Sequence, residues 1–160
     1  MAAKIRVLFV CSGNICRSPM ADAVFRQMVA DAGLSDRIDV DSAGTGSWHV
    51  GEAPHRGTMT ILQQHNIPYD ERARQFQSSD LSTFDYVLAM DSSHLSFMRR
   101  VGDNPPAEVA MFLSYANKVG TVQKADVPDP YYNGGFDAVY SLVERGCKAL
   151  LDHIRAEHHL

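Results

Sequence analysis

Near the N-terminus, Cys11 and Arg17 are separated by five residues, Ser12, Gly13, Asn14, Ile15 and Cys16. A short loop of this length can bring a sulfur and a guanidinium to opposite sides of one anion. The guanidinium is permanently charged and matches two oxygens of a phosphate group, and a thiolate is a strong nucleophile. The pair therefore predicts transfer of a phosphoryl group to cysteine. The alternative is a buried core cysteine and an unrelated surface arginine.

The segments on either side of this loop would build an anion cradle. The apolar run 7–10 predicts a strand buried on both faces, and residues 12–14 tolerate a tight turn. Ser18 and Pro19 predict a helix start, with Ser18 as N-cap and Pro19 at the first helical position. Backbone N–H groups and the positive helix end would then hold an anion and keep Cys11 ionised at neutral pH.

A second reactive group is needed on the far side of the phosphoryl group, because the leaving oxygen must be protonated. Asp129 is the candidate. It lies between two prolines, which stiffen the backbone, in a long segment, 114–135, that is predicted to be largely irregular and that also contains Tyr131 and Tyr132. The alternative is a Pro-Asp-Pro turn with no chemical role.

The loop resembles the active-site loop of the low-molecular-weight protein tyrosine phosphatases, Cys-x5-Arg-Ser near the N-terminus. Nearly the whole chain is similar to that family, because further segments match it in order: Ser42-Ala43-Gly44-Thr45, Ala73-Arg74-Gln75, Phe84 to Leu88 with Met90-Asp91, and Asp129-Pro130-Tyr131-Tyr132.

This resemblance implies hydrolysis of phosphotyrosine and small aryl phosphate monoesters through a cysteinyl-phosphate intermediate, with inorganic phosphate as product and no metal or cofactor. Cys11 would be the nucleophile, Arg17 would bind the phosphoryl group, and Asp129 would act first as acid and then as base. The substrate-binding residues would be Ser12, Gly13, Asn14, Ile15, Cys16, Ser18, Trp48, Tyr131 and Tyr132.

The resemblance also implies supporting roles. Ser18 would donate to the Cys11 sulfur, and Asn14, at positive φ, would bond to Ser42. A His of the family is replaced here by Glu71, which would join the same network while adding negative charge. Each of these residues could instead be an ordinary cap or turn residue.

Two loop residues carry further expectations from the resemblance. Cys16 would form a reversible disulfide with Cys11 that prevents over-oxidation, or it is simply a small packing residue. In relatives that cleave phosphoarginine a Thr occupies the position of Ile15, and an apolar side chain there favours a flat aromatic ring. Trp48 and the two tyrosines would wall a slot deep enough for phosphotyrosine, although each could be ordinary packing.

The remaining pattern predicts strands alternating with helices. Strands are expected at 7–10, 38–42, 85–90 and 109–113, and helices at 20–29, 56–65, 91–100 and 136–154. Right-handed crossovers then give a single-domain three-layer α/β/α fold over residues 1–160, with a four-stranded parallel sheet and helices on both faces. The carboxyl ends of the strands would gather Cys11, Ser42 and Asp91.

Composition narrows the setting of this chemistry. The chain has 160 residues, 45% of them hydrophobic and 21% charged, which is typical of a globular domain. A net charge of −4 without a basic cluster argues against nucleic-acid binding, and no apolar stretch is long enough to span a membrane. Three cysteines and a start, Met1 to Lys4, without room for a signal peptide favour the cytoplasm. A monomer is the default expectation.

Two other functions are open on the same loop. An arsenate reductase would need further cysteines as a disulfide relay, and there are none between Arg17 and Cys147, which is expected to be inert core. A phosphate-binding module without catalysis could have discarded Cys11 or Asp129, and this chain keeps both. No Cys/His group has zinc-ligand spacing, and the two histidines at 158–159 are expected to be a solvated tail.

Overall fold

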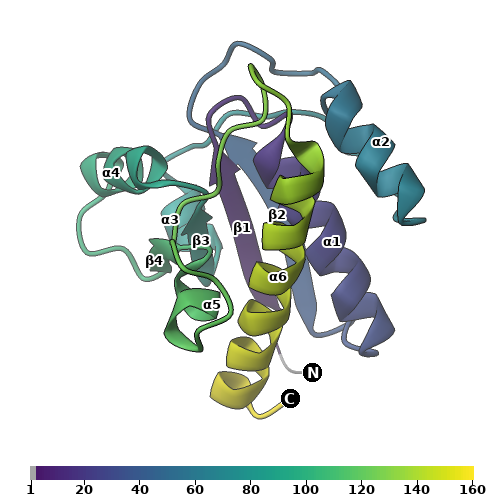
Figure 1. The fold of residues 1–160 in the computed structure, drawn as a ribbon. Helices are drawn as coiled ribbons and strands as arrows, with labels where there is room; N and C mark the ends of the chain where they lie inside the picture. The colour runs from purple at the N-terminus through teal and green to yellow at the C-terminus, as the bar shows by residue number, and fades with distance from the viewer. Residues whose placement is uncertain (1–2) are drawn as a thin grey trace.

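A four-stranded parallel sheet forms the centre of the computed structural model, which describes residues 3–160 (Figure 1). Met1 and Ala2, part of the N-terminal stretch predicted to lack a signal peptide, lie outside the described residues. The strands are β1 (Ile5–Cys11), β2 (Ile38–Gly44), β3 (Tyr86–Ala89) and β4 (Glu108–Met111), in the order β2-β1-β3-β4. All four strands predicted from the sequence are therefore confirmed.

The helices cover both faces of this sheet. They are α1 (Arg17–Asp31), α2 (Arg56–Gln64), α3 (Asp80–Thr83), α4 (Ser92–Val101), α5 (Ser114–Lys118) and α6 (Phe136–His158). Figure 1 shows α6 running along the sheet beside α1, and these two helices contact each other. The opposite face packs against α3 and α4 through Leu81 and Met98. The predicted three-layer α/β/α fold is confirmed.

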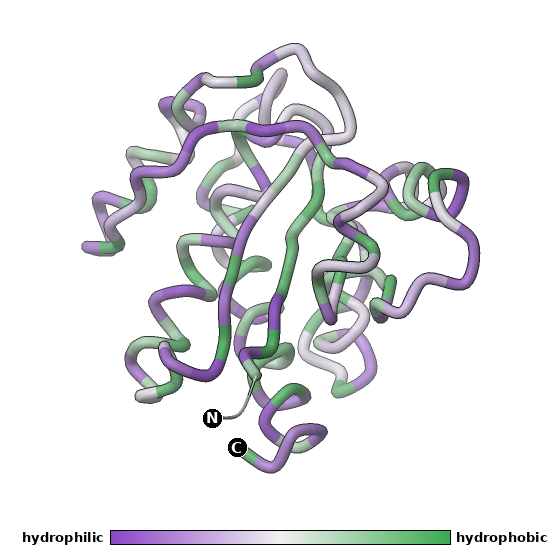
Figure 2. Tube along the Cα trace, turned by 180° about the vertical axis from the view of Figure 1, so that it is seen from behind, coloured by the Kyte–Doolittle hydropathy of each residue, from purple (hydrophilic) through white to green (hydrophobic). Residues whose placement is uncertain are grey.

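The central strand β1 is buried on both faces because it has a neighbouring strand on each side and helices above and below. Val7 and Phe9 belong to the core under α1 and α6, and Leu8 and Val10 belong to the core under α3 and α4. Figure 2 shows hydrophobic colouring along most of the strand that rises from the N-terminus. A continuous apolar run is the pattern expected of such a strand, and β1 leads directly into the loop at Cys11.

The predicted start of α1 was wrong. The helix begins at Arg17 after Cys16, and Ser18 is not its N-cap. The hydroxyl of Ser18 is engaged elsewhere, 2.9 Å from the sulfur of Cys11 and 2.8 Å from Asn14 Nδ2. Pro19 still lies in the first turn, where a missing N–H costs no intrahelical hydrogen bond.

The structure adds two short helices and lengthens one predicted helix. The segment 114–135 is not wholly irregular, because it begins with the short helix α5, and the short helix α3 was not predicted. Helix α6 continues past Ile154 to His158, whose Nε2 lies 3.0 Å from the hydroxyl of Tyr86. His158 and His159 are exposed, as predicted, but His158 ends a helix rather than lying in a tail. No helix within residues 3–160 is long and apolar enough to cross a membrane.

Helix α6 packs closely against the core at Gly146. A Cβ atom at this position would lie 2.6 Å from Phe112 Cζ and 2.7 Å from Leu113 Cδ2, both on fully buried side chains. These contacts are shorter than van der Waals separations, and the phenyl ring of Phe112 already packs edge-on against Phe9.

We therefore predict that Gly146→Ala destabilises the protein. Overpacking costs about 1–3 kcal/mol, which outweighs the gain of about 1 kcal/mol in helix propensity. Urea unfolding should show a free energy of unfolding lower by about 1 kcal/mol, whereas Lys148→Ala, exposed on the same helix, should change it little. An unchanged or more stable Gly146→Ala protein would contradict the close packing.

Candidate active site

The loop between β1 and α1 is held at the carboxyl end of the sheet by backbone hydrogen bonds from the segment that follows β2. The N–H groups of Thr45 and Gly46 donate to the carbonyl oxygens of Cys11 and Ser12, at 2.8 and 3.0 Å. Gly44 makes this close approach possible, because a Cβ there would lie 2.7 Å from the Ser12 carbonyl oxygen. The end of β2 and the loop that follows it thus fix the shape of the Cys11 loop.

Asn14 fixes the same loop from the inside. Its φ is +59°, in the left-handed region that asparagine tolerates. Its side chain is buried and fully bonded: Nδ2 donates to Ser18 Oγ (2.8 Å) and Ser42 Oγ (2.9 Å), and Oδ1 accepts from the N–H of Arg74 (3.0 Å). The predicted positive φ of Asn14 and its bond to Ser42 are confirmed.

The sulfur of Cys11 faces a hydrogen-bond donor. Ser18 Oγ lies 2.9 Å from Cys11 Sγ. Because Ser18 Oγ already accepts from Asn14, its own proton is free to point at the sulfur. This contact is the predicted hydrogen bond between Ser18 and the Cys11 sulfur.

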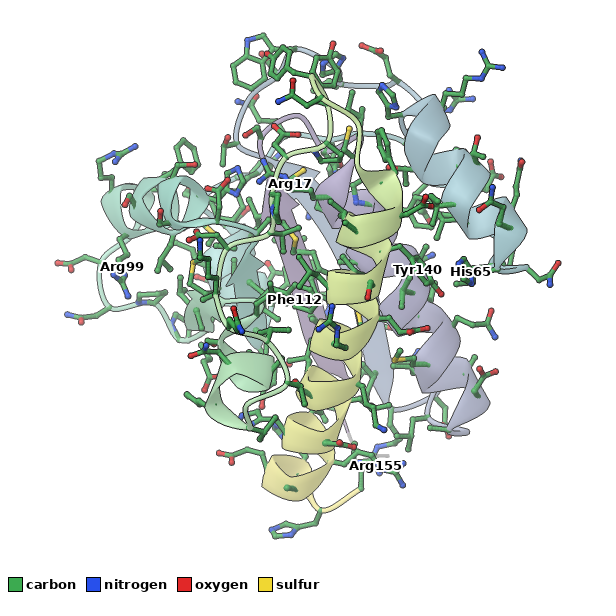
Figure 3. The ribbon with its side chains drawn as sticks, in the orientation of Figure 1. Arg17, His65, Arg99, Phe112, Tyr140 and Arg155 are labelled. Carbon is green, nitrogen blue, oxygen red and sulfur yellow. The ribbon has the colours of Figure 1, made fainter. Side chains whose placement is uncertain are left out.

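Arg17 is almost completely buried at the same end of the sheet (Figure 3), with a relative exposure of 3%. Its Nη1 donates to Asp91 Oδ2 at 2.7 Å and to the carbonyl oxygen of Val127 at 2.9 Å, and its Nη2 lies 3.5 Å from Asp129 Oδ2. Burial alone would raise the pKa of Asp91, but hydrogen bonds from Ser93 and Arg17 lower it to about 2. Asp91 therefore provides a fixed negative charge that orients the guanidinium.

A cavity of about 520 Å³ opens above this loop. It brings together the predicted residues Cys11, Ser12, Gly13, Ile15, Cys16, Arg17, Trp48, Asp129, Tyr131 and Tyr132, together with His49. Trp48 and Tyr132 are strongly exposed, at 71% and 84%, so they stand at the rim rather than in the core. Asn14, Ser18 and Ser42 lie beneath the cavity and support its floor.

The segment that carries Asp129 is anchored by aromatic contacts. The carboxylate Oδ1 of Asp129 accepts from the N–H of Tyr131 at 3.0 Å. The Tyr131 ring lies edge-on to His55 at a centroid distance of 5.7 Å, and His55 in turn stacks on Phe136 at the start of α6. This stack holds the acid candidate over the cavity. The contribution of His55 was not predicted from the sequence.

Glu71 was predicted to join the network beneath the loop, but it does not bond directly to the network residue Ser42 and is linked to it only through Arg26, Asp22 and Tyr69. Its side chain is exposed and bonds to Arg26 at 3.1 Å. Tyr69 occupies the place instead: its hydroxyl donates to Asp22 at 2.6 Å and lies 3.3 Å from Ser42 Oγ. The physical reason is that the backbone here turns Glu71 toward solvent and Tyr69 inward.

The other two cysteines differ from Cys11 in their surroundings. Burial, together with the negative charges at Cys11 and Asp129, raises the pKa of the Cys16 thiol to about 12, so Cys16 is protonated at neutral pH. The disulfide between Cys11 and Cys16 stays a prediction. Cys147 is fully buried in α6, as expected of a core residue. A buried thiol of this kind does not suit the disulfide relay of an arsenate reductase.

Sequence reasoning missed His94, which is buried at the first turn of α4 against the loop. Its only sequence signal is its position three residues after the N-cap Asp91. Within residues 3–160, no cluster of three or more His, Cys, Asp or Glu side chains is arranged to hold a metal ion.

Comparisons with known proteins agree with this geometry. A family model described as low molecular weight phosphotyrosine protein phosphatase matches residues 6–160. The low molecular weight protein-tyrosine-phosphatase YfkJ of Bacillus subtilis is 46% identical, over 98% of this chain and 99% of that protein. PtpA of Staphylococcus aureus strain MRSA252, described in the same words, is 44% identical, over 94% of each protein.

Solved structures share the fold of this chain. The crystal structure of YfkJ from Bacillus subtilis superposes with a TM-score of 0.92 at 45% identity, over 98% of each chain. A crystal structure described as a Drosophila arginine phosphatase superposes with a TM-score of 0.87 at 34% identity, over 94% of this chain and 98% of that one.

The pairing of Arg17 with Asp91 predicts a specific acid sensitivity. The pKa of Asp91 is about 2 in the folded protein against 3.8 as its ordinary value, so its ionised form stabilises the fold above about pH 4. This contribution is lost as the pH falls from about 4 to 2, and it amounts to about 1 kcal/mol for a partly exposed carboxylate.

In urea unfolding, wild type should be more stable than Asp91→Asn at pH 6. That difference in the free energy of unfolding should narrow at pH 2.5 by roughly two thirds of this contribution of about 1 kcal/mol. Asp103→Asn, in an exposed turn, serves as the matched control. A difference between wild type and Asp91→Asn that is the same at both pH values would contradict the assignment.

Proposed function

The chain belongs to the low molecular weight phosphotyrosine protein phosphatase family and is a protein tyrosine phosphatase, and we propose that Cys11, Arg17 and Asp129 carry its reaction. The substrate class is a phosphoprotein or aryl phosphate. One observation carries the assignment: a buried sulfur that receives a hydrogen bond faces a cavity which also contains a buried guanidinium and a carboxylate.

In the first step, the Cys11 thiolate attacks phosphorus. The S–P bond forms as the bond from phosphorus to the phenolic oxygen breaks, and Asp129 in its acid form gives its proton to that oxygen. Arg17 binds two phosphoryl oxygens and balances their charge. Its Nη1 is held by Asp91 and Val127, so Nη2 and Nε are the groups directed toward the substrate.

In the second step, the Asp129 carboxylate takes a proton from water, whose oxygen attacks phosphorus. The S–P bond breaks, which releases inorganic phosphate and restores the Cys11 thiolate. The hydrogen bond from Ser18 stabilises the departing sulfur. Neither step requires a metal or a cofactor.

The rim of the cavity supports phosphotyrosine as the substrate side chain. Trp48, Tyr131 and Tyr132 offer aromatic faces around an opening whose floor is the Cys11 loop, and Ile15 adds an apolar surface. A phosphoserine is too short to reach the sulfur from such a rim.

We propose that the catalytic unit is one domain over residues 1–160 and acts as a monomer without nucleic-acid or membrane partners. We place it in the cytoplasm, where a reducing environment keeps a catalytic thiol active.

The role of Asp129 predicts a dependence on the leaving group. Asp129→Ala should slow turnover of phenyl phosphate by ~10²–10⁴-fold, the usual contribution of a general acid. It should slow p-nitrophenyl phosphate less, because that leaving group needs less protonation. Steady-state kinetics with EDTA present would measure both rates.

Two variants frame this measurement. Cys11→Ser should abolish turnover of both esters, and Asp137→Ala, which removes an exposed carboxylate at the start of α6, should retain it. An equal loss for both esters in Asp129→Ala would count against the general acid, and turnover by Cys11→Ser would count against the nucleophile.

Trp48 at the rim predicts a separation of KM from kcat. Its contact with an aromatic substrate is worth about 1 kcal/mol, so Trp48→Ala should raise KM for aryl phosphates by roughly fivefold and change kcat less. Val50→Ala is the matched control, because Val50 is exposed in the same loop but does not line the cavity. An unchanged KM would remove Trp48 from the binding surface.

A further inference from the structure

His94 is a buried histidine in contact with the catalytic loop, and the mechanism above does not use it. Its exposure is 2%. The Nε2 atom lies 2.9 Å from Ser12 Oγ, and the Nδ1 atom lies 3.2 Å from the backbone nitrogen of Asp91. His94 therefore bridges the start of α4 and the loop that holds the phosphoryl group.

The start of α4 determines which nitrogen of His94 carries the proton. The backbone N–H of Asp91 donates to Nδ1, so Nδ1 must accept and cannot bear a hydrogen. Asp91 Oδ1, the acceptor that could compete for a proton on Nδ1, already receives hydrogen bonds from Ser93 N, Ser93 Oγ and His94 N. The proton of the neutral ring is consequently on Nε2.

Burial keeps the His94 ring neutral. Burial, and after it the positive charge of Arg17, lower the pKa of His94 to about 4, although Asp91 and Asp129 act in the opposite direction. Arg17 Nη2 is 3.5 Å from Nε2, but both groups are donors and cannot bond to each other. Ser12 Oγ is thus the acceptor for the Nε2 proton.

A Ser12 oxygen that accepts from His94 has its own proton left to donate. Ser12 lines the cavity together with Cys11 and Arg17. We propose that the Ser12 hydroxyl donates a hydrogen bond to a bound phosphoryl oxygen, and that His94 is the positioning residue that holds the hydroxyl in this orientation. This inference rests on the proposed function, because it assumes that the phosphoryl group occupies the Cys11 loop.

The direct test measures the competitive inhibition constant of inorganic phosphate against p-nitrophenyl phosphate. Ser12→Ala should weaken phosphate binding roughly tenfold, since a hydrogen bond to a charged group is lost. His94→Asn should do the same. Its shorter amide can still accept from Asp91 N near the position of Nδ1, but it has no donor that reaches Ser12.

A double variant separates this role from a general structural one. If His94 acts through Ser12, adding His94→Asn to Ser12→Ala should cause no further loss of phosphate affinity. His94→Gln should restore much of the affinity, because its longer amide reaches Ser12 with an N–H, and glutamine at this helix position also suits the capping box. Two results would overturn the proposal. One is a loss of phosphate affinity in the double variant equal to the product of the two single losses. The other is unchanged phosphate affinity in Ser12→Ala.

A spectroscopic measurement tests the tautomer without relying on variants that fold poorly. Long-range ¹H–¹⁵N correlation spectra of the wild-type protein between pH 5 and 8 should show a His94 ring protonated at Nε2 only. Protonation at Nδ1 would overturn the proposal. Failure here is distinct from failure of the proposed function, which would appear as turnover in Cys11→Ser.

Discussion

The arrangement of the catalytic end depends on one buried charge, the guanidinium of Arg17. A charged group that is 3% exposed is very costly unless it is paired and hydrogen-bonded. Asp91 and the Val127 carbonyl satisfy Nη1, and Asp129 lies across from Nη2. These partners come from the start of α4 and from the loop before α6. One guanidinium therefore ties together three segments that are far apart in the sequence.

The same end of the sheet also supports the sulfur, by hydrogen bonds instead of by charge. Asn14 donates to Ser18 and Ser42, and Ser18 is left to donate to Cys11. Each hydroxyl in this series has its direction set by the neighbour that already donates to it. His94 and Ser12 repeat the principle on the other side of the loop, where a helix cap determines the direction of the first donor.

The sequence predicted these features where the cause is local. The apolar run of β1 and the helix that begins near Asp91 depend on residue type and immediate neighbours. Prediction failed where a tertiary partner decides the outcome. Ser18 has the right chemistry for an N-cap, yet its hydroxyl faces Cys11, and Tyr69 rather than Glu71 turns toward Ser42. His94 could be recognised only once α4 was placed against the loop.

The contrast between the two sulfurs of the loop has a consequence for chemical inhibition. Both Cys11 and Cys16 border the same cavity, but burial keeps Cys16 in its thiol form at physiological pH, and thiols are poor nucleophiles toward alkylating groups. Cys16 therefore does not compete with Cys11, the proposed nucleophile, for an electrophilic inhibitor that enters the cavity. Selectivity between adjacent cysteines is thus built into the pocket, and a warhead need only be matched to the shape of the rim.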